Sequence, residues 1–225
     1  MEETSWSARH CLSAGDVEFL LNAMTDDDAN RDGLFRLLAD PDSLDQILDS
    51  ESLTRALEKG EGAVRLSSRL FFYVLLRRAL LEVGLEDRDL ADYVAGVCAE
   101  CVRAGRLTQP FRERQTALLL SIDYAQELDA AQGSRRFHLM SAAGNHYLFM
   151  TGFFAAYIEA RAQRRGAPGV GYYMGIGQRS FATARDHRLA REYALDAIFD
   201  TLVQAFPQVR LSLCEVAERC QRLSA

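Results

Sequence analysis

Residues 137–184 read FHLMSAAGNHYLFMTGFFAAYIEARAQRRGAPGVGYYMGIGQRSFATA. Apolar side chains recur every three or four positions here, and the stretch lacks the alternation of a half-buried strand. The pattern predicts one bent helix or two from Ser134 to Arg165, and another helix near Tyr172–Arg185 after a glycine-rich loop. Gly144 and Gly152 are the expected bends or close contacts, because glycine lets a helix kink or approach a neighbour closely.

The same helical pattern continues outward to both ends of the chain. Ser13 with Asp16 forms a capping pattern, and Asp40 precedes Pro41, a residue tolerated in the first helical turn. The sequence therefore predicts an all-α fold, a multi-helix bundle of about ten helices. Beyond the quoted stretch, the expected helices are Ala14–Met24, Asp32–Ala39, one beginning at Pro41, Glu51–Lys59, Val64–Val83, Arg88–Ala104, Arg114–Ala131, Leu189–Phe206 and Gln208–Leu223.

Charge divides the chain into two parts. Residues 1–60 carry 14 acidic and 5 basic side chains, whereas the remaining 165 residues carry 18 acidic and 21 basic ones. We expect a small helical N-terminal subdomain, residues 1–62, packed on a main helical bundle, residues 63–225. The acidic part either docks on the more basic remainder or forms a solvated face. The net charge of −6 does not favour non-specific attraction to nucleic acid or to an anionic membrane.

The sequence predicts a cytoplasmic protein that makes no use of a membrane. Its first residues show neither the basic segment nor the apolar segment of a secretory signal. The most apolar runs, Leu70–Leu76 and Tyr147–Ile158, fall short of the roughly 20 residues that a membrane-spanning helix needs. Five cysteines, an odd number, indicate reduced thiols in a reducing compartment.

The cysteines do not form a convincing redox or metal site. Cys98 and Cys101 form a CxxC pair, but they fall in the last turns of a predicted helix. Redox pairs use the helix N-terminus instead, where the helix dipole lowers the thiol pKa. Cys214 and Cys220 have five residues between them rather than two, so they do not complete a zinc site. We predict no metal and no particular cofactor.

Polar side chains in the apolar run after Phe137 are candidates for a ligand site. Burying Asn145 or His146 without a partner costs about 1–3 kcal/mol, so each should find a hydrogen bond or a ligand. These side chains fix helix packing, line a small-molecule pocket or contact a partner. The ligand-binding candidates are His138, Asn145, His146, Tyr172 and Tyr173.

A cluster of arginines with interleaved aromatic residues follows this run. Such a surface suits phosphate, nucleotides, single-stranded nucleic acid or an acidic protein. Pairing with the acidic N-terminal part explains the cluster equally well. The glycines do not form a phosphate-binding loop, because no GxxxxGK[ST] pattern is present. The interaction candidates are Arg161, Arg164, Arg165, Arg179, Arg185, Arg188 and Arg191.

Three hypotheses for function follow from these patterns. Under the leading one, the chain is a cytosolic interaction or regulatory protein that binds a protein partner, or itself, through the arginine–aromatic surface of residues 160–191. The alternative is a bundle that binds a small ligand, cofactor or metal near His138, Asn145 and His146, with catalysis left open. The third is nucleic-acid binding through the same arginines. No GxSxG or HExxH motif favours a hydrolase, and the sequence favours a protein that is not an enzyme.

Overall fold

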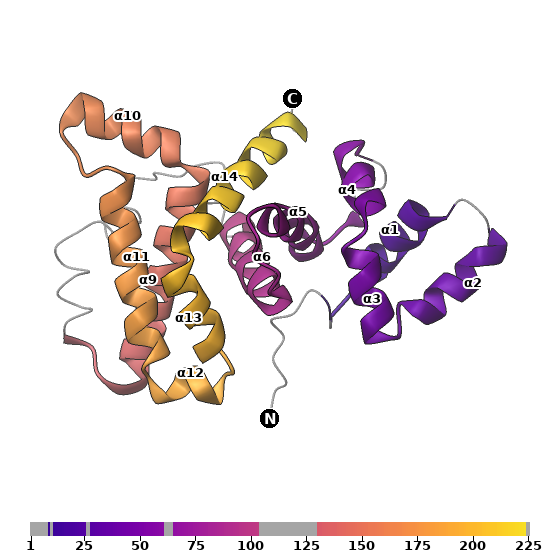
Figure 1. Cartoon of the computed structure of the whole chain (residues 1–225), viewed down its shortest axis with the longest axis horizontal. Helices are drawn as coiled ribbons and strands as arrows, with labels where there is room; N and C mark the ends of the chain where they lie inside the picture. Colours follow the sequence, from indigo (N-terminus) through magenta and orange to yellow (C-terminus); the bar gives the residue numbers. More distant parts are fainter. Residues whose placement is uncertain (1–8, 10, 26–27, 61–64, 104–129, 224–225) are drawn as a thin grey trace. The chain divides into compact units, whose positions relative to one another are not determined.

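The structure is a computed structural model that describes residue 9 and residues 11–25, 28–60, 65–103 and 130–223. These residues form twelve helices and no strand (Figure 1), which confirms the all-α prediction. They divide into unit 1, Met1–Ala99 with Glu215–Ala225, and unit 2, Glu100–Cys214. The boundary predicted at residues 62–63 lies outside the described residues, as does nearly all of the predicted helix Arg114–Ala131.

Unit 1 is built around a helix that is apolar on nearly all sides. Side chains from Leu70 to Leu80 are almost all buried, so this helix, α5, forms the core of the unit. The shorter α3 and α4 each bury a single stripe of three residues. None of residues 30–37 in α2 is buried. The helices are α1 (Ala14–Met24), α2 (Asp28–Leu37), α3 (Pro41–Leu48), α4 (Glu51–Glu58), α5 (Ser68–Glu82) and α6 (Arg88–Arg103).

Side-chain caps confirm two of the predicted helix starts. Ser13 and Asp16 form a capping box at α1: the Asp16 amide donates to Ser13 Oγ at 3.1 Å, and the Ser13 amide donates to Asp16 Oδ2 at 2.9 Å. The second oxygen of the buried Asp16 carboxylate accepts a 2.7 Å bond from the amide of Ser67, the N-cap residue of α5. At α3, Asp40 accepts from the amide of Ser43 at 2.9 Å. The Asp16 carboxylate thus joins the starts of α1 and α5.

Unit 2 contains five further helices and the first half of a sixth, α14, and in it α9 and α11 pack side by side and antiparallel (Figure 1). Glycines make the close contacts possible. A Cβ on Gly144 would lie 2.7 Å from the Phe181 ring, and one on Gly152 would lie 2.5 Å from Leu213 Cβ, which confirms both as close-contact positions. The helices are α9 (Gly133–Phe153), α10 (Ala155–Arg165), α11 (Val170–Arg185), α12 (Arg188–Glu192), α13 (Asp196–Gln204) and α14 (Phe206–Leu223).

Two segments form pairs of helices. The segment Ser134–Arg165 is two helices, separated by Phe154. The segment Leu189–Phe206 was predicted as one helix, and that prediction is wrong. It breaks after Glu192, where Ala194 adopts a left-handed conformation with φ of 53°. The first break follows Gly152, a predicted bend, by two residues, whereas no glycine or proline stands at the second break, so the sequence offers no local signal there.

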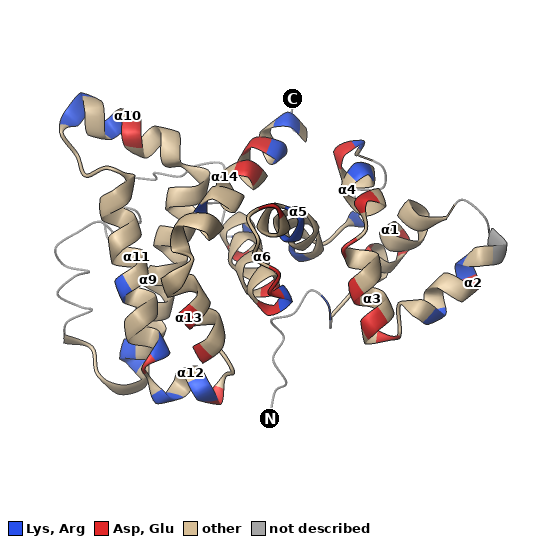
Figure 2. Ribbon diagram, in the orientation of Figure 1, with Lys and Arg blue, Asp and Glu red and all other residues tan. Residues whose placement is uncertain are grey.

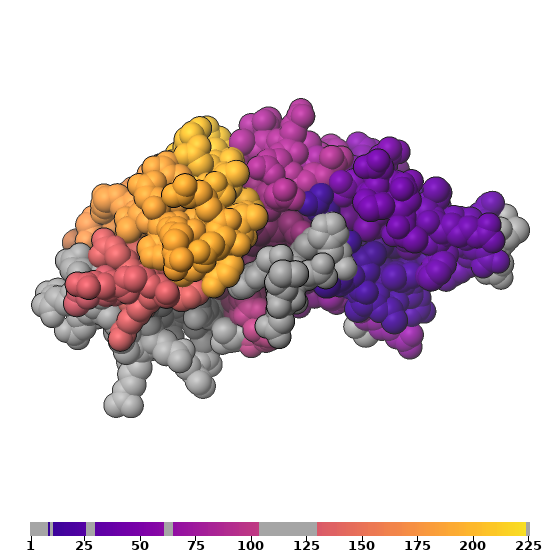
Figure 3. Space-filling model, turned by 90° about the horizontal axis from the view of Figure 1, so that it is seen from below, coloured from indigo at the N-terminus to yellow at the C-terminus, as the bar shows by residue number. Residues whose placement is uncertain are grey.

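Aromatic side chains fill the interior of unit 2. Phe181, Phe199 and Phe206 are fully buried, and the ring centroids of Phe181 and Phe199 lie 5.3 Å apart. In the space-filling view, the residues of α11 to α13, in orange, form a continuous surface over this unit (Figure 3). In the described part of the chain, every helix is too short or too polar to traverse a lipid bilayer.

Candidate functional site

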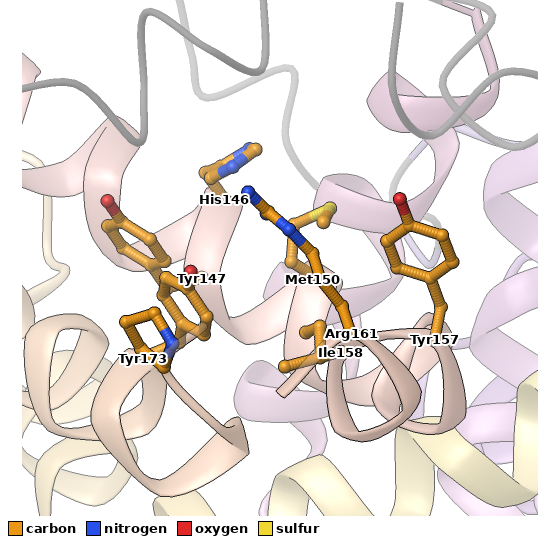
Figure 4. Close-up of a pocket in the computed structure, with 8 residues that line it drawn as sticks. His146, Tyr147, Met150, Tyr157, Ile158, Arg161 and Tyr173 are labelled. Atoms are coloured by element: carbon orange, nitrogen blue, oxygen red, sulfur yellow. The ribbon is translucent and has the colours of Figure 1, made fainter. Parts of the chain in front are cut away.

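A pocket in unit 2 lies among α9, α10 and the start of α11 (Figure 4). Helix α9 contributes His146, Tyr147 and Met150, which lie on one face because residues three and four apart are neighbours on a helix. Ala143 is buried one turn earlier, where a small side chain leaves room for the packing of α11. The close contact between Gly144 and Phe181 holds α9 against α11 and thereby fixes this wall.

Helix α10 forms the opposite wall with Tyr157, Ile158 and Arg161, and Pro168 and Tyr173 complete the lining. Figure 4 shows the Arg161 side chain extending from α10 toward His146 on α9. The hollow measures about 330 Å³, including space open to solvent, and its enclosed part about 10 Å³. The enclosed part has room for about one water molecule. A ligand that fills the hollow therefore stays partly exposed.

The turn between α10 and α11 is held by one glutamate. Glu159 Oε1 accepts a 2.9 Å hydrogen bond from the amide of Val170, the first residue of α11. A carboxylate is favourable at this position because the first amides of a helix have no partner within the helix. Glu159 is the only acidic residue between Ala130 and Arg185 in the sequence. It fixes Pro168 and Tyr173 relative to α10.

Two stacked tyrosines form one wall of the pocket. The rings of Tyr147 and Tyr173 lie 5.9 Å apart with an interplanar angle of 14°, and both residues are buried. Burial raises the pKa of Tyr173, an effect that the Arg161 charge partly offsets. The Tyr173 hydroxyl is therefore a neutral hydrogen-bond donor at neutral pH.

The lining contains one arginine, Arg161, and one histidine, His146. Arg161 is half-buried, and among the described residues no carboxylate forms an ion pair with it. His146 is buried, and its ring packs edge-on against that of Tyr147 at 5.3 Å. No described residue of the lining is acidic. The pocket thus combines an aromatic wall with an arginine.

The structure brings together two of the five predicted ligand-binding residues, His146 and Tyr173. His138 is exposed near the start of α9, where its ring lies 6.5 Å from Tyr193, and it does not line the pocket. Asn145 is half-buried and Tyr172 is 57% exposed, and neither lines the pocket. Although His138 and Asn145 share a helix face, that face is not the one turned toward α10.

Sequence reasoning missed five of the lining residues. They are apolar or aromatic. Side chains of this kind fill a hydrophobic core more often than they line a binding site, so no motif identified them. The sequence did contain one signal. Arg161 follows Tyr157 by four residues and Ile158 by three, a spacing that makes the three side chains neighbours on one helix face. The missed residues are Tyr147, Met150, Tyr157, Ile158 and Pro168.

The seven predicted interaction arginines fall into two groups at opposite ends of α11 (Figure 2). Arg161, Arg164 and Arg165 lie on α10, near the start of α11. The other four lie on α11 and α12, and α11 itself spans about 24 Å at 1.5 Å per residue. In this second group, Arg185 binds Asp186 at 2.9 Å and Asp200 at 2.7 Å, and Arg188 binds Glu192 at 3.2 Å. The second group consists of Arg179, Arg185, Arg188 and Arg191.

No cluster of three or more metal-ligating side chains occurs among the described residues. Cys98 and Cys101 are buried in the second half of α6, as their place in the predicted helix indicated. All five cysteines are free thiols. Burial raises the pKa of Cys220 to about 11, so this thiol stays protonated at neutral pH.

A partly buried network of charged side chains lies within unit 1. Arg77 donates to both oxygens of Asp49, at 2.8 and 3.2 Å, and to the Glu86 carbonyl at 2.7 Å. Arg88 donates to the same Asp49 at 2.6 Å. Because Asp49 follows α3 and the arginines belong to α5 and α6, these ion pairs link the end of α3 to the two helices that follow α4.

Arg9 extends this network toward the N-terminus. It lies 3.3 Å from Asp45 and also pairs with Asp89 and Asp92. The ring of Tyr73 is fully buried beside these charges, and burial raises its pKa strongly. Its hydroxyl has no hydrogen-bond partner among the described residues. The network therefore ties the first described residue to α3 and α6.

Comparison of the chain with known protein families, with curated proteins and with solved structures finds no match.

Proposed function

We propose that unit 2 binds a small organic molecule in the pocket among α9, α10 and α11. The observation that supports this proposal is the convergence of His146 and Arg161 on one aromatic-walled hollow. Ligand sites are typically concave, mostly apolar surfaces of about 300–1,000 Å³ with a few placed polar groups. The enclosed part of this hollow, about 10 Å³, lies well below that range, so the open lining would hold most of a ligand.

Binding, rather than a reaction, is the function that this lining supports. The described residues that line the pocket include a histidine, but no serine, cysteine or lysine that a base could activate. The polar groups can orient a ligand by hydrogen bonds, and the aromatic rings can cover its apolar part. We also retain the cytoplasm as the proposed location, on the odd number of cysteines.

A matched pair of tyrosine variants tests this proposal. Tyr157 lines the pocket and is 46% exposed, whereas Tyr172 is 57% exposed and does not line it. An NMR screen of aromatic fragments should find binders that shift the methyl signals of Met150 and Ile158. Tyr157→Ala should weaken these binders several-fold, because one aromatic contact contributes about 1 kcal/mol. Tyr172→Ala should leave the affinity unchanged. Binders that shift neither methyl, or an equal loss in both variants, would contradict a pocket at this place.

A second candidate is binding of a protein partner, or of a second copy of the chain, through the end of α10. The exposed Tyr172, Arg164 and Arg165 support it, since tyrosine and arginine are enriched in protein interfaces. Light scattering after gel filtration tests self-association. Arg164→Glu combined with Arg165→Glu should abolish any dimer and leave the thermal midpoint nearly unchanged. Nucleic acid is the less favoured partner, because Arg185 and Arg188 already pair with carboxylates.

A further inference from the structure

The charge of the pocket indicates what kind of molecule it accepts. Arg161 brings a positive charge to the lining, and no described lining residue brings a negative one. The acidic side chain nearest in sequence, Glu159, is bound to the amide of Val170 at 2.9 Å. A cationic ligand would be repelled by Arg161, and no carboxylate among the described lining residues would compensate for this. An anionic ligand would instead pair with Arg161.

The shape of the pocket indicates what apolar group the ligand carries beside its charged one. The stacked rings of Tyr147 and Tyr173 form one wall of the pocket, and their planes are nearly parallel, with an interplanar angle of 14°. Figure 4 places these two rings on one side of Arg161 and Tyr157 on the other. A planar apolar group therefore fits along the tyrosine wall while remaining within reach of the guanidinium. Offset stacking on such rings is the favoured arrangement of aromatic groups.

We propose that the pocket binds an aromatic carboxylate, with its ring against Tyr147 and Tyr173 and its carboxylate paired to Arg161. This inference rests on the proposed function, because it names the ligand class of the same pocket. The planar guanidinium matches a carboxylate with two parallel hydrogen bonds, which a lysine could not provide. The neutral Tyr173 hydroxyl and the ring of His146 supply further polar groups in the lining.

Three naphthalene probes of one shape and different charge test the ligand class. We would measure the Kd of 2-naphthoate, of 2-naphthalenemethanol and of 2-naphthylmethylamine by NMR titration of the full chain. 2-Naphthoate should bind about tenfold or more tightly than the neutral alcohol, since charge-assisted hydrogen bonds are roughly twice as strong as neutral ones. The amine should bind most weakly. Arg161→Gln should remove the preference for the carboxylate, whereas Arg164→Gln, one turn along α10 and outside the lining, should keep it.

The outcomes separate this inference from the proposed function. If the alcohol binds as tightly as 2-naphthoate, with shifts at Met150 and Ile158, the pocket stands and the carboxylate class is wrong. Carboxylate binding that survives Arg161→Gln would also overturn the inference. If none of the probes binds, both proposals fall. Thermal midpoints of both variants within a few degrees of the wild type exclude misfolding as the cause of any loss.

Discussion

Arginine side chains are surrounded differently in the two units. In unit 1, Arg77 is 5% exposed and donates to a carboxylate and a carbonyl, and Arg9 is 13% exposed among three aspartates. In unit 2, Arg164 and Arg165 are exposed on α10, and Arg161 faces a pocket whose described lining residues include no acidic one. The same residue type therefore stabilises the fold at Arg9 and Arg77 and remains available to a ligand or partner on α10. Burial and pairing, rather than clustering in the sequence, distinguish the two uses.

The largest effect should come from removing a buried arginine of unit 1. Arg77→Met keeps most of the apolar stem but leaves Asp49 and the Glu86 carbonyl without this donor. We expect a loss of about 3 kcal/mol in the free energy of unfolding, because Asp49 keeps only its pair with Arg88 and the Glu86 carbonyl loses this donor. Urea unfolding followed by circular dichroism measures it. Arg78→Met is the control, since Arg78 is 41% exposed and pairs with Glu82 on the helix surface; its cost should stay below about 0.5 kcal/mol.

Unit 2 should respond instead to added volume at its glycines. A Cβ at Gly177 would lie 2.7 Å from the Phe206 ring, whereas nothing lies within 4 Å of one at Gly171 in the same helix. Gly177→Ala should cost about 1–3 kcal/mol by overpacking. Gly171→Ala should stabilise by up to about 1 kcal/mol, because alanine favours the helix. Thermal unfolding of the two variants should therefore give shifts of opposite sign, and equal signs would argue against the close packing of α11.

Acid should weaken unit 1 through Asp49. Burial by itself raises the pKa of Asp49, but the hydrogen bonds from Arg77 and Arg88 outweigh it, so the pKa is lowered overall. The unfolded chain binds this proton near pH 3.9, and the folded chain binds it only at lower pH. The stabilisation is therefore complete above the unfolded pKa and is lost as the pH falls through the folded one. Urea midpoints measured from pH 6 to pH 3 should fall less steeply for Asp49→Asn than for the wild type.

The smallest effect is expected at the exposed arginines of α10. Arg164→Ala and Arg165→Ala should each change the free energy of unfolding by less than about 0.5 kcal/mol, because surface substitutions away from buried networks cost little. Urea unfolding of both variants measures this difference. A loss above 1 kcal/mol would show that these arginines stabilise the fold through internal contacts, as Arg77 does in unit 1. The arginines of α10 would then no longer differ from those of unit 1.

The sequence predicts the fold better than it predicts the site. Helical period and the caps at Ser13 and Asp40 correctly predicted α1 and α3, because both signals are local. The break at Ala194 could not be predicted, since no residue there favours a left-handed backbone. For the pocket, polarity within an apolar run identified His146. Which face of α9 meets α10 depends on tertiary packing, so the sequence could not separate His146 from His138.

The carboxylate of Asp16 has a consequence for how unit 1 opens. It joins the starts of α1 and α5 through residues that lie 51 positions apart, and α2 to α4 lie in the chain between them. Helix α2 buries none of its residues 30–37, so few contacts oppose its separation from the rest. Regions with few buried contacts open at low free energy and exchange their amide hydrogens early. We therefore expect α2 to take up deuterium long before α1 and α5, which stay joined at Asp16 while it opens.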